Sequence, residues 1–312
     1  MRRLFALTIL LLAAACGRDA DEALLDSRIP PSISPRFYPP EGWAWEAVDV
    51  PGARPVRYGV AAPALAPKAH VVLLAGWNEP AEVFFETARD LNARGFAVWA
   101  LDPAPTPQAG AQAVDRLIRQ VVRPASGQAV TIAAHGSAAP AALLALQDGA
   151  PADGLLLWDP RLNEPLAARA REKASLGLGG TQADGEVPWR RPDYDLTGRA
   201  TLPQAWALAN PDLRPKPRTW NWFDAQGRAI ATIREPARKP SFKSPIFVLD
   251  ADQAACAGYA ACVAHPLPSR RPHHLAADPI RTAWLAALTA FAERRATVVG
   301  EQAALRAQGR SR

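Results

Sequence analysis

Short apolar segments that alternate with helix-like segments dominate this sequence. Runs typical of buried strands recur in the order "AHVVLLAG", "FAVWALD", "AVTIAAH", "GLLLWDP" and "SPIFVLDAD". Amphipathic stretches lie between several of them, such as "AEVFFETARDLNARG", where apolar residues recur at helical spacing until a glycine. Strands that alternate with helices need crossover connections, which produce a parallel sheet covered on both faces. The sequence therefore predicts an α/β fold.

The N-terminus has the features of an export signal. Residues 1–15, "MRRLFALTILLLAAA", combine a basic start, an apolar run and small residues, and they are too short for a spanning helix. Cys16 follows directly, which resembles the lipobox of bacterial lipoproteins and implies lipidation of this cysteine. The alternatives are ordinary cleavage before a free cysteine and retention as an uncleaved anchor. We expect a lipid-anchored protein of the bacterial cell envelope, facing the periplasm or the outside.

Composition divides the rest of the chain into three parts. Residues 16–41 are polar and Pro-rich, which predicts a tether and an extended lead-in. One α/β domain is predicted for 42–297, with an inserted cap at about 162–217 where the strand–helix rhythm breaks. Residues 298–312 are predicted to form a polar tail.

Several classes of function find no support in the residues. The formal charge of +6 is spread along the chain, without the basic stripe and interleaved aromatics typical of nucleic-acid binding. Phosphate-binding loops, dinucleotide fingerprints and zinc-binding helix motifs are missing, so no cofactor and no metal are expected. Cys256 and Cys262 would either form a disulfide in an oxidising compartment or remain two small buried thiols.

The stretch "AHGSAA" joins an apolar strand to a helix, as the nucleophile turn of many hydrolases does. Such a turn needs small residues two positions before and two positions after the nucleophile. A turn centred on Gly136 has Ala134 and Ala138 at these positions. A turn centred on Ser137 has His135 at the earlier one, where an imidazole fits badly. The steric pattern therefore favours Gly136, which carries no nucleophile.

Longer stretches resemble the α/β-hydrolase superfamily, and within it bacterial lysophospholipases and monoacylglycerol-lipase-like esterases. The resemblance covers about residues 36–296. It rests on "PEGWAW", "VVLLAGWNEPAEVFFETARDLNARGFAVWALD", "AHGSAAPAALLALQ", "NPDLRPKPRTWNWFDAQGRAI", "SPIFVLDAD" and "DPIRTAWLAALTAF". It implies a mostly parallel central sheet with helices on both faces and an inserted cap. In active members it also implies serine ester hydrolysis by a Ser–His–acid triad.

The resemblance assigns the nucleophile and the oxyanion hole. Its usual "H-S-x-G" aligns with "HGSA", so Gly136 stands at the nucleophile's place. Ser137 would act through a shifted turn, or else lie on the first helical turn as a cap. The oxyanion hole would come from the backbone N–H of Trp77 or Asn78 together with that of Ser137.

The resemblance also assigns the acid and the base. Asp252 is the first choice for the acid and Asp250 the second, although a surface-turn aspartate would look the same. His273 is the first choice for the base and His274 the second, and two solvated loop histidines would look identical.

Three departures from the family meet at this one site. The turn lacks its serine, the loop before the acid is contracted, and "DPAPTPQAGAQ" replaces a longer Gly-rich loop after "WALD". We therefore hypothesise a degenerate, noncatalytic hydrolase that binds an acyl or lipid-like ligand, or a partner, through the cap and pocket. The alternatives are an active serine carboxylic-ester hydrolase of the lysophospholipase or monoacylglycerol lipase kind, acting through Ser137, and a structural role in the envelope.

Overall fold

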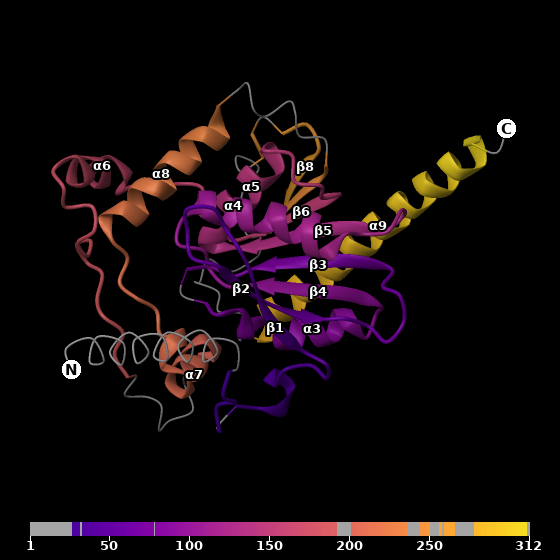
Figure 1. Cartoon of the computed structure of the whole chain (residues 1–312), viewed down its shortest axis with the longest axis horizontal. Helices are drawn as coiled ribbons and strands as arrows, with labels where there is room; N and C mark the ends of the chain where they lie inside the picture. The colour runs from indigo at the N-terminus through magenta and orange to yellow at the C-terminus, as the bar shows by residue number, and fades with distance from the viewer. Residues whose placement is uncertain are drawn as a thin grey trace, which may run out of the picture.

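A single sheet of eight strands organises the molecule, with helices on both of its faces (Figure 1). The computed structural model describes residues 27–31, 33–77, 79–191, 201–235, 244–249, 256–257, 259–265 and 278–310. The strands are β1 (Ala44–Val48), β2 (Val56–Ala61), β3 (Ala69–Leu74), β4 (Phe96–Leu101), β5 (Ala129–His135), β6 (Gly154–Trp158), β7 (Ile246–Leu249) and β8 (Cys262–His265). Their order in the sheet is β1-β2-β4-β3-β5-β6-β7-β8. Only β2 runs antiparallel to its neighbours β1 and β4, so the mostly parallel sheet predicted from the sequence is confirmed.

The helices lie in the connections between these strands. They are α3 (Phe85–Asn92), α4 (Pro107–Arg116), α5 (Ala139–Gln147), α6 (Ala167–Ser175), α7 (Leu202–Ala209), α8 (Trp220–Arg234) and α9 (Asp278–Arg310). Short 3-10 turns are η1 (Pro35–Phe37), η2 (Ala81–Phe84), η4 (Gly136–Ala138) and η6 (Pro211–Leu213). A π-helical turn, η3 (Leu117–Val122), continues α4. The predicted helix in "AEVFFETARDLNARG" thus divides into η2 and α3.

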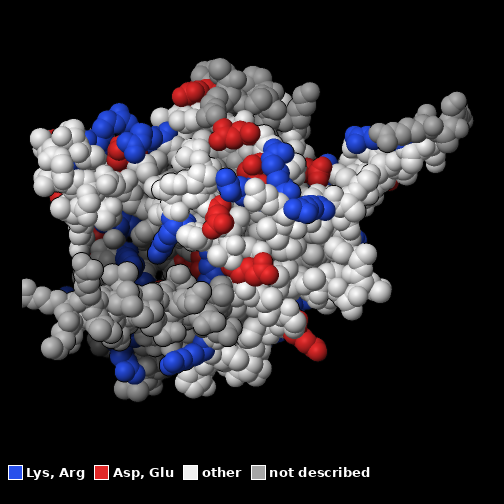
Figure 2. Space-filling view, viewed as in Figure 1, with Lys and Arg blue, Asp and Glu red and all other residues white. Residues whose placement is uncertain are grey.

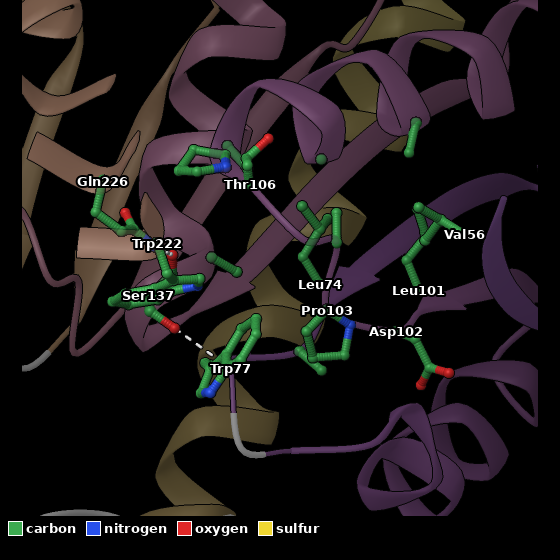
Figure 3. Close-up of a pocket in the computed structure, with 17 residues that line it drawn as sticks. Val56, Leu74, Trp77, Leu101, Asp102, Pro103, Thr106, Ser137, Trp222 and Gln226 are labelled. Atoms are coloured by element: carbon green, nitrogen blue, oxygen red, sulfur yellow. Dashed lines mark hydrogen bonds between the residues drawn. The ribbon is translucent and has the colours of Figure 1, made fainter. Parts of the chain in front are cut away.

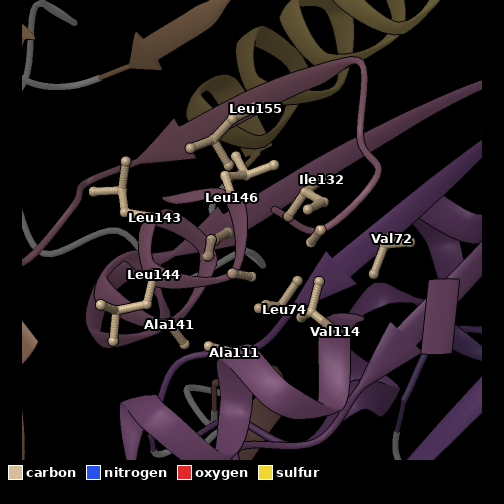
Figure 4. Close-up of a cluster of buried hydrophobic side chains, with 14 of the residues drawn as sticks. Val72, Leu74, Ala111, Val114, Ile132, Ala141, Leu143, Leu144, Leu146 and Leu155 are labelled. Carbon is tan, nitrogen blue, oxygen red and sulfur yellow. The ribbon is translucent and has the colours of Figure 1, made fainter. Parts of the chain in front are cut away.

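Side chains of the central strands alternate between two hydrophobic cores. On β3, Val72 and Leu74 belong to the core under α4 and α5 (Figure 4), whereas Val71 and Leu73 belong to the core under α3 and α9. This alternation follows from the two-residue period of a strand. Because both faces are covered, the central strands are apolar throughout, which is why they appear in the sequence as continuous runs.

The predicted cap insertion contains α6, α7 and η6, and α8 follows it. α6 packs against α8 at Gly227, where an added Cβ would lie 2.3 Å from the Cβ of Ala167. A third apolar cluster, with Trp220, Trp222 and Phe223 from α8, fills the space between these helices. The cap therefore has a small core of its own.

The lead-in is joined to the cap before it reaches the sheet. The N–H of Arg28 donates to Asn210 Oδ1 at 2.7 Å, and Asn210 Nδ2 donates to the carbonyl oxygen of Arg28 at 3.0 Å. Ser27 also bonds to Glu82 in η2. Residues 27 and 28 thus lie between the cap and the body of the domain.

The C-terminal end of the molecule is helical. α9 continues through the predicted polar tail to Arg310, and its last part projects from the body in Figure 1. Cys256 and Cys262 form a disulfide. Among the described residues, no helix has the length and apolarity to cross a membrane. The predicted signal peptide and Cys16 lie outside the described residues.

Candidate functional site

The turn between β5 and α5 is centred on Gly136. This residue has φ +55°, in the left-handed region that glycine adopts without steric strain. A Cβ added there would meet no atom within 4 Å. The position that the steric pattern marked as the nucleophile's place therefore has room for a side chain.

The hydroxyl of Ser137 lies against the first predicted oxyanion donor. Ser137 Oγ accepts a hydrogen bond from the backbone N–H of Trp77 at 2.9 Å (Figure 3). The carbonyl oxygen of Ser137 is held in turn by Gln226 Nε2 of α8 at 3.1 Å. Ser137 is thus fixed between the end of β3 and the helix that follows the cap, and its hydroxyl bonds to Trp77 rather than capping α5.

A buried histidine–carboxylate pair lies beneath the turn. His135 Nδ1 and Glu79 Oε2 are 2.6 Å apart, and the N–H of Gly76 also donates to Glu79 Oε2 at 3.3 Å. The ring of His135 packs on Trp158 with 4.6 Å between ring centroids. Within the described residues, His135 Nε2 is buried without a hydrogen-bond partner.

The surroundings of His135 raise its pKa above the ordinary value. Burial alone would lower this pKa, because it disfavours the charged imidazolium. The charge of Glu79, the hydrogen bond to it and the charge of Asp159 outweigh burial, while the charge of Arg161 acts in the opposite direction. These surroundings therefore favour the charged imidazolium form of His135.

A cavity of about 480 Å³ opens beside the turn, at the carboxyl ends of β3, β5 and β6. Body and cap both line it, with Gly76, Trp77, Glu79, His135, Gly136, Ser137, Asp159, Arg161, Trp189, Arg190, Thr201, Pro203, Gln204, Ala207, Pro215 and Arg218. The N–H of Arg161 donates to the carbonyl oxygen of Gly136 at 3.0 Å, which ties the start of the cap to the turn.

A smaller, mostly apolar pocket of about 40 Å³ adjoins this cavity. Trp77 and Ser137 line both spaces. The rings of Trp77 and Trp222, 5.4 Å apart between centroids, form one wall, and Leu74 and Pro103 belong to the opposite side (Figure 3). The site thus consists of a polar cavity and an apolar pocket that meet at Ser137.

The structure brings together only some of the residues predicted for the site. Gly136, Ser137 and Trp77 meet at the turn. The remaining predicted positions lie outside the described residues: Asn78, Asp250, Asp252, His273 and His274. In the described part of the chain, no group of three or more His, Cys, Asp or Glu side chains could hold a metal ion.

Comparisons with known proteins address the fold. No protein-family model matches the sequence, and no curated protein matches it. A carboxyl esterase from Bacillus coagulans, solved with glycerol, matches with a TM-score of 0.60 at 14% identity, over 82% of this chain and all (100%) of that chain. A soluble variant of monoglyceride lipase from Saccharomyces cerevisiae, solved with a substrate analog, matches with a TM-score of 0.61 at 12% identity, over 86% and 99% of the two chains. The chain has the α/β-hydrolase fold.

A further solved structure matches the same fold. A lipase in its open form matches with a TM-score of 0.57 at 18% identity, over 81% of this chain and 99% of that chain. The predicted α/β-hydrolase fold and the resemblance to esterases and monoglyceride lipases are therefore confirmed. At these identities the likeness shows the fold, whereas function has to be argued from the site.

Several polar residues of this site, among them Glu79, Arg161 and Arg190, were missed by the sequence analysis. Glu79 lies 56 residues from His135, and the sequence carries no signal that would pair them. Arg161 lies directly before the predicted cap and Arg190 lies within it, where hydrophobic periodicity is weak. Only the charge of "WRRP", next to a tryptophan at the edge of the predicted insertion, could have marked Arg190 for attention.

Proposed function

We propose that this protein is a noncatalytic α/β-hydrolase that binds an acyl or lipid-like ligand, and that it is exported and lipid-anchored at Cys16. One observation carries the proposal. The turn has its sharp left-handed residue at Gly136, with open space where a nucleophile would stand and no side chain to fill it.

The hydrogen bond of Ser137 supports binding over turnover. In acyl transfer, backbone N–H donors hold the carbonyl oxygen while charge develops on it. The N–H of Trp77, predicted for this role, already donates to Ser137 Oγ. For Ser137 to act as the nucleophile, its hydroxyl would have to leave this donor so that a substrate oxygen could take its place. That requirement weighs against the esterase alternative.

The dimensions and walls of the site suit a ligand. The cavity of about 480 Å³ falls within the range of roughly 300–1,000 Å³ that is common for small-molecule sites. The apolar pocket beside it is walled by Trp77 and Trp222, and aromatic walls suit the apolar part of an acyl ligand.

The lead-in supports a membrane source for that ligand. About 11 residues separate Cys16 from Ser27, and a fully extended chain of this length spans at most about 40 Å. The chain then contacts Asn210 directly after α7. A lipid anchor at Cys16 would therefore keep the cap within about 40 Å of the membrane surface.

Labelling with a fluorophosphonate, which reacts with activated serines, tests the proposal on the full chain in lipid nanodiscs. We expect no labelling of the wild type. Labelling of the wild type that disappears in Ser137→Ala would overturn the proposal and establish the esterase alternative.

Gly136→Ser completes the experiment, because the added side chain would point into free space. Labelling of this variant alone would mean that the rest of a hydrolase site surrounds the missing serine. Circular dichroism should confirm that both variants are folded.

A further inference from the structure

We propose that the cavity beneath the cap binds the anionic head group, a carboxylate or a phosphate, of a small amphiphile. This inference rests on the proposed function, because it names the ligand class of the same site. Its basis is a pair of arginines, Arg161 and Arg190, that line the cavity.

Neither arginine has a partner for its charge in the described part of the chain. Among the described residues, no hydrogen bond or salt bridge joins the guanidinium of Arg161 or of Arg190 to another group. Figure 2 shows basic side chains around a hollow between α6 and α7. Two unpaired guanidiniums at one cavity offer planar, multiple-donor recognition of a carboxylate or phosphate.

The third arginine of the cavity has a structural partner. Arg218 donates from Nε to Glu186 at 3.0 Å and stacks over the rings of Trp222 and Phe223. The backbone N–H of Arg218 donates to the same carboxylate. Arg218 therefore holds the cap together, whereas the guanidiniums of Arg161 and Arg190 have no such partner in the part of the chain that the structure describes.

The acidic residues of the cavity do not cancel these charges. Glu79 is bonded to His135, whose raised pKa favours a balancing positive charge. Asp159 acts on the same histidine, since its charge contributes to the raised pKa of His135. Among the described residues that line the cavity, three are arginines and two are acids, and Arg218 is paired with Glu186 outside that lining.

Ser137 adds a neutral donor at the inner end of the cavity. Its oxygen accepts from the Trp77 N–H, so its own O–H proton is free to donate. The Arg161 backbone bonds to Gly136, and its side chain lines the same cavity. A head group in the cavity would thus have both a hydroxyl donor and a guanidinium among its walls.

The volume of the apolar pocket limits the size of the ligand's apolar part. It meets the cavity at Trp77 and Ser137, and its volume is about 40 Å³. In this measure one water needs roughly 10–15 Å³, so the pocket has room for only a few carbon atoms. The site therefore suits an anionic head group that carries a short apolar group.

The test compares three water-soluble probes that share a four-carbon chain: butanoate, butyl phosphate and 1-butanol. Saturation-transfer NMR would measure their affinities for the full chain in lipid nanodiscs, with empty nanodiscs as the reference. The double variant Arg161→Gln/Arg190→Gln removes the proposed counter-charges. Arg94→Gln is the matched control, because Arg94 is exposed and lies just before β4, at the opposite end of the sheet from the cavity.

We expect the wild type to bind at least one of the two anions about fivefold more tightly than 1-butanol, as partly exposed charge pairs allow. The anion with the larger preference identifies the head group. The preference should disappear in the double variant, persist in Arg94→Gln and weaken with added salt, while 1-butanol binds equally to all three proteins.

Equal affinity of the wild type for the anions and 1-butanol would overturn this inference, as would a preference that survives in the double variant. Either result would leave the proposed acyl-ligand binding intact. Absence of binding for all three probes would contradict the proposed function as well.

Discussion

Arginines at two places in this molecule have opposite surroundings. Arg57 on β2 is enclosed: its guanidinium donates to Asp102 at 2.6 Å and to Glu82 at 2.8 Å, and it lies 4.0 Å from the ring centroid of Trp45. Arg161 and Arg190 line an open cavity, and no acid among the described residues bonds to their guanidiniums. The same side chain serves to hold the fold together in one place and is available to a ligand in the other.

The two places share the same residue type and differ in the charged groups that surround the guanidinium. Burial by itself would lower the pKa of Arg57, but the charges of Asp102 and Glu82 and the hydrogen bonds to them raise it. Glu82 is fully buried, so it depends on this arginine for its charge balance. A substitution at Arg57 should therefore affect stability, and one at the cavity should affect binding.

The largest effect is expected for Arg57→Gln. Removing one member of a buried ion pair leaves the other charge buried and unpaired, which destabilises by about 3–5 kcal/mol. Urea unfolding of this variant and of Arg94→Gln measures the effect. A loss below about 1 kcal/mol, similar to that of a surface substitution, would show that the cluster is not structural.

An intermediate effect is expected for Glu79→Gln, which leaves His135 without its carboxylate. The pKa of His135 is raised in the folded protein. The pair's contribution to stability is therefore complete below about pH 6.5, the ordinary value for histidine, and is lost as the pH rises through the higher folded-state pKa. We expect the variant to be about 1.5–3 kcal/mol less stable at pH 6, with a smaller deficit at high pH.

Urea unfolding of the wild type and Glu79→Gln between pH 5.5 and about pH 9 would reveal this convergence. Glu82 also has a raised pKa, because of its burial. It is present in both proteins, so the difference between them isolates His135. A deficit that stays constant across the whole range would argue against a charged pair.

The smallest effect on stability is expected for Arg161→Gln/Arg190→Gln. Both side chains are exposed and lack protein partners among the described residues, so the free energy of unfolding should change by less than about 0.5 kcal/mol. Thermal unfolding without ligand would check this. A loss as large as that of Arg57→Gln would assign these arginines to the fold and undermine the contrast between the two places.

The sheet and the turn could be predicted from the sequence because both depend on local patterns. The continuous apolar runs predicted strands that are covered on both faces. The structure agrees, because the side chains of Val71 and Val72 enter opposite cores. The small residues around Gly136 indicated the centre of the turn, and its φ of +55° agrees. Such features rest on the size and polarity of near neighbours along the chain.

Contacts between distant segments could not be predicted. The bond from Trp77 to Ser137 joins residues 60 positions apart, and it depends on the register of β3 against β5. Arg161 and Arg190 reach the cavity through loops without periodicity. The polarity of residues 298–312 predicted a tail without specifying its conformation. α9 continues through this segment to Arg310, with its last turns mostly exposed.

The left-handed backbone at Gly136 affects how many destabilising substitutions this fold can tolerate. A non-glycine residue held in a sparsely populated backbone region stores about 1–3 kcal/mol of strain, which an enzyme tolerates because the strained residue performs the reaction. Glycine adopts this conformation without that strain, so the proposed noncatalytic turn has a margin of stability that a residue with a side chain would lack. That margin would let later, mildly destabilising substitutions accumulate in the cap and around the cavity without unfolding the domain.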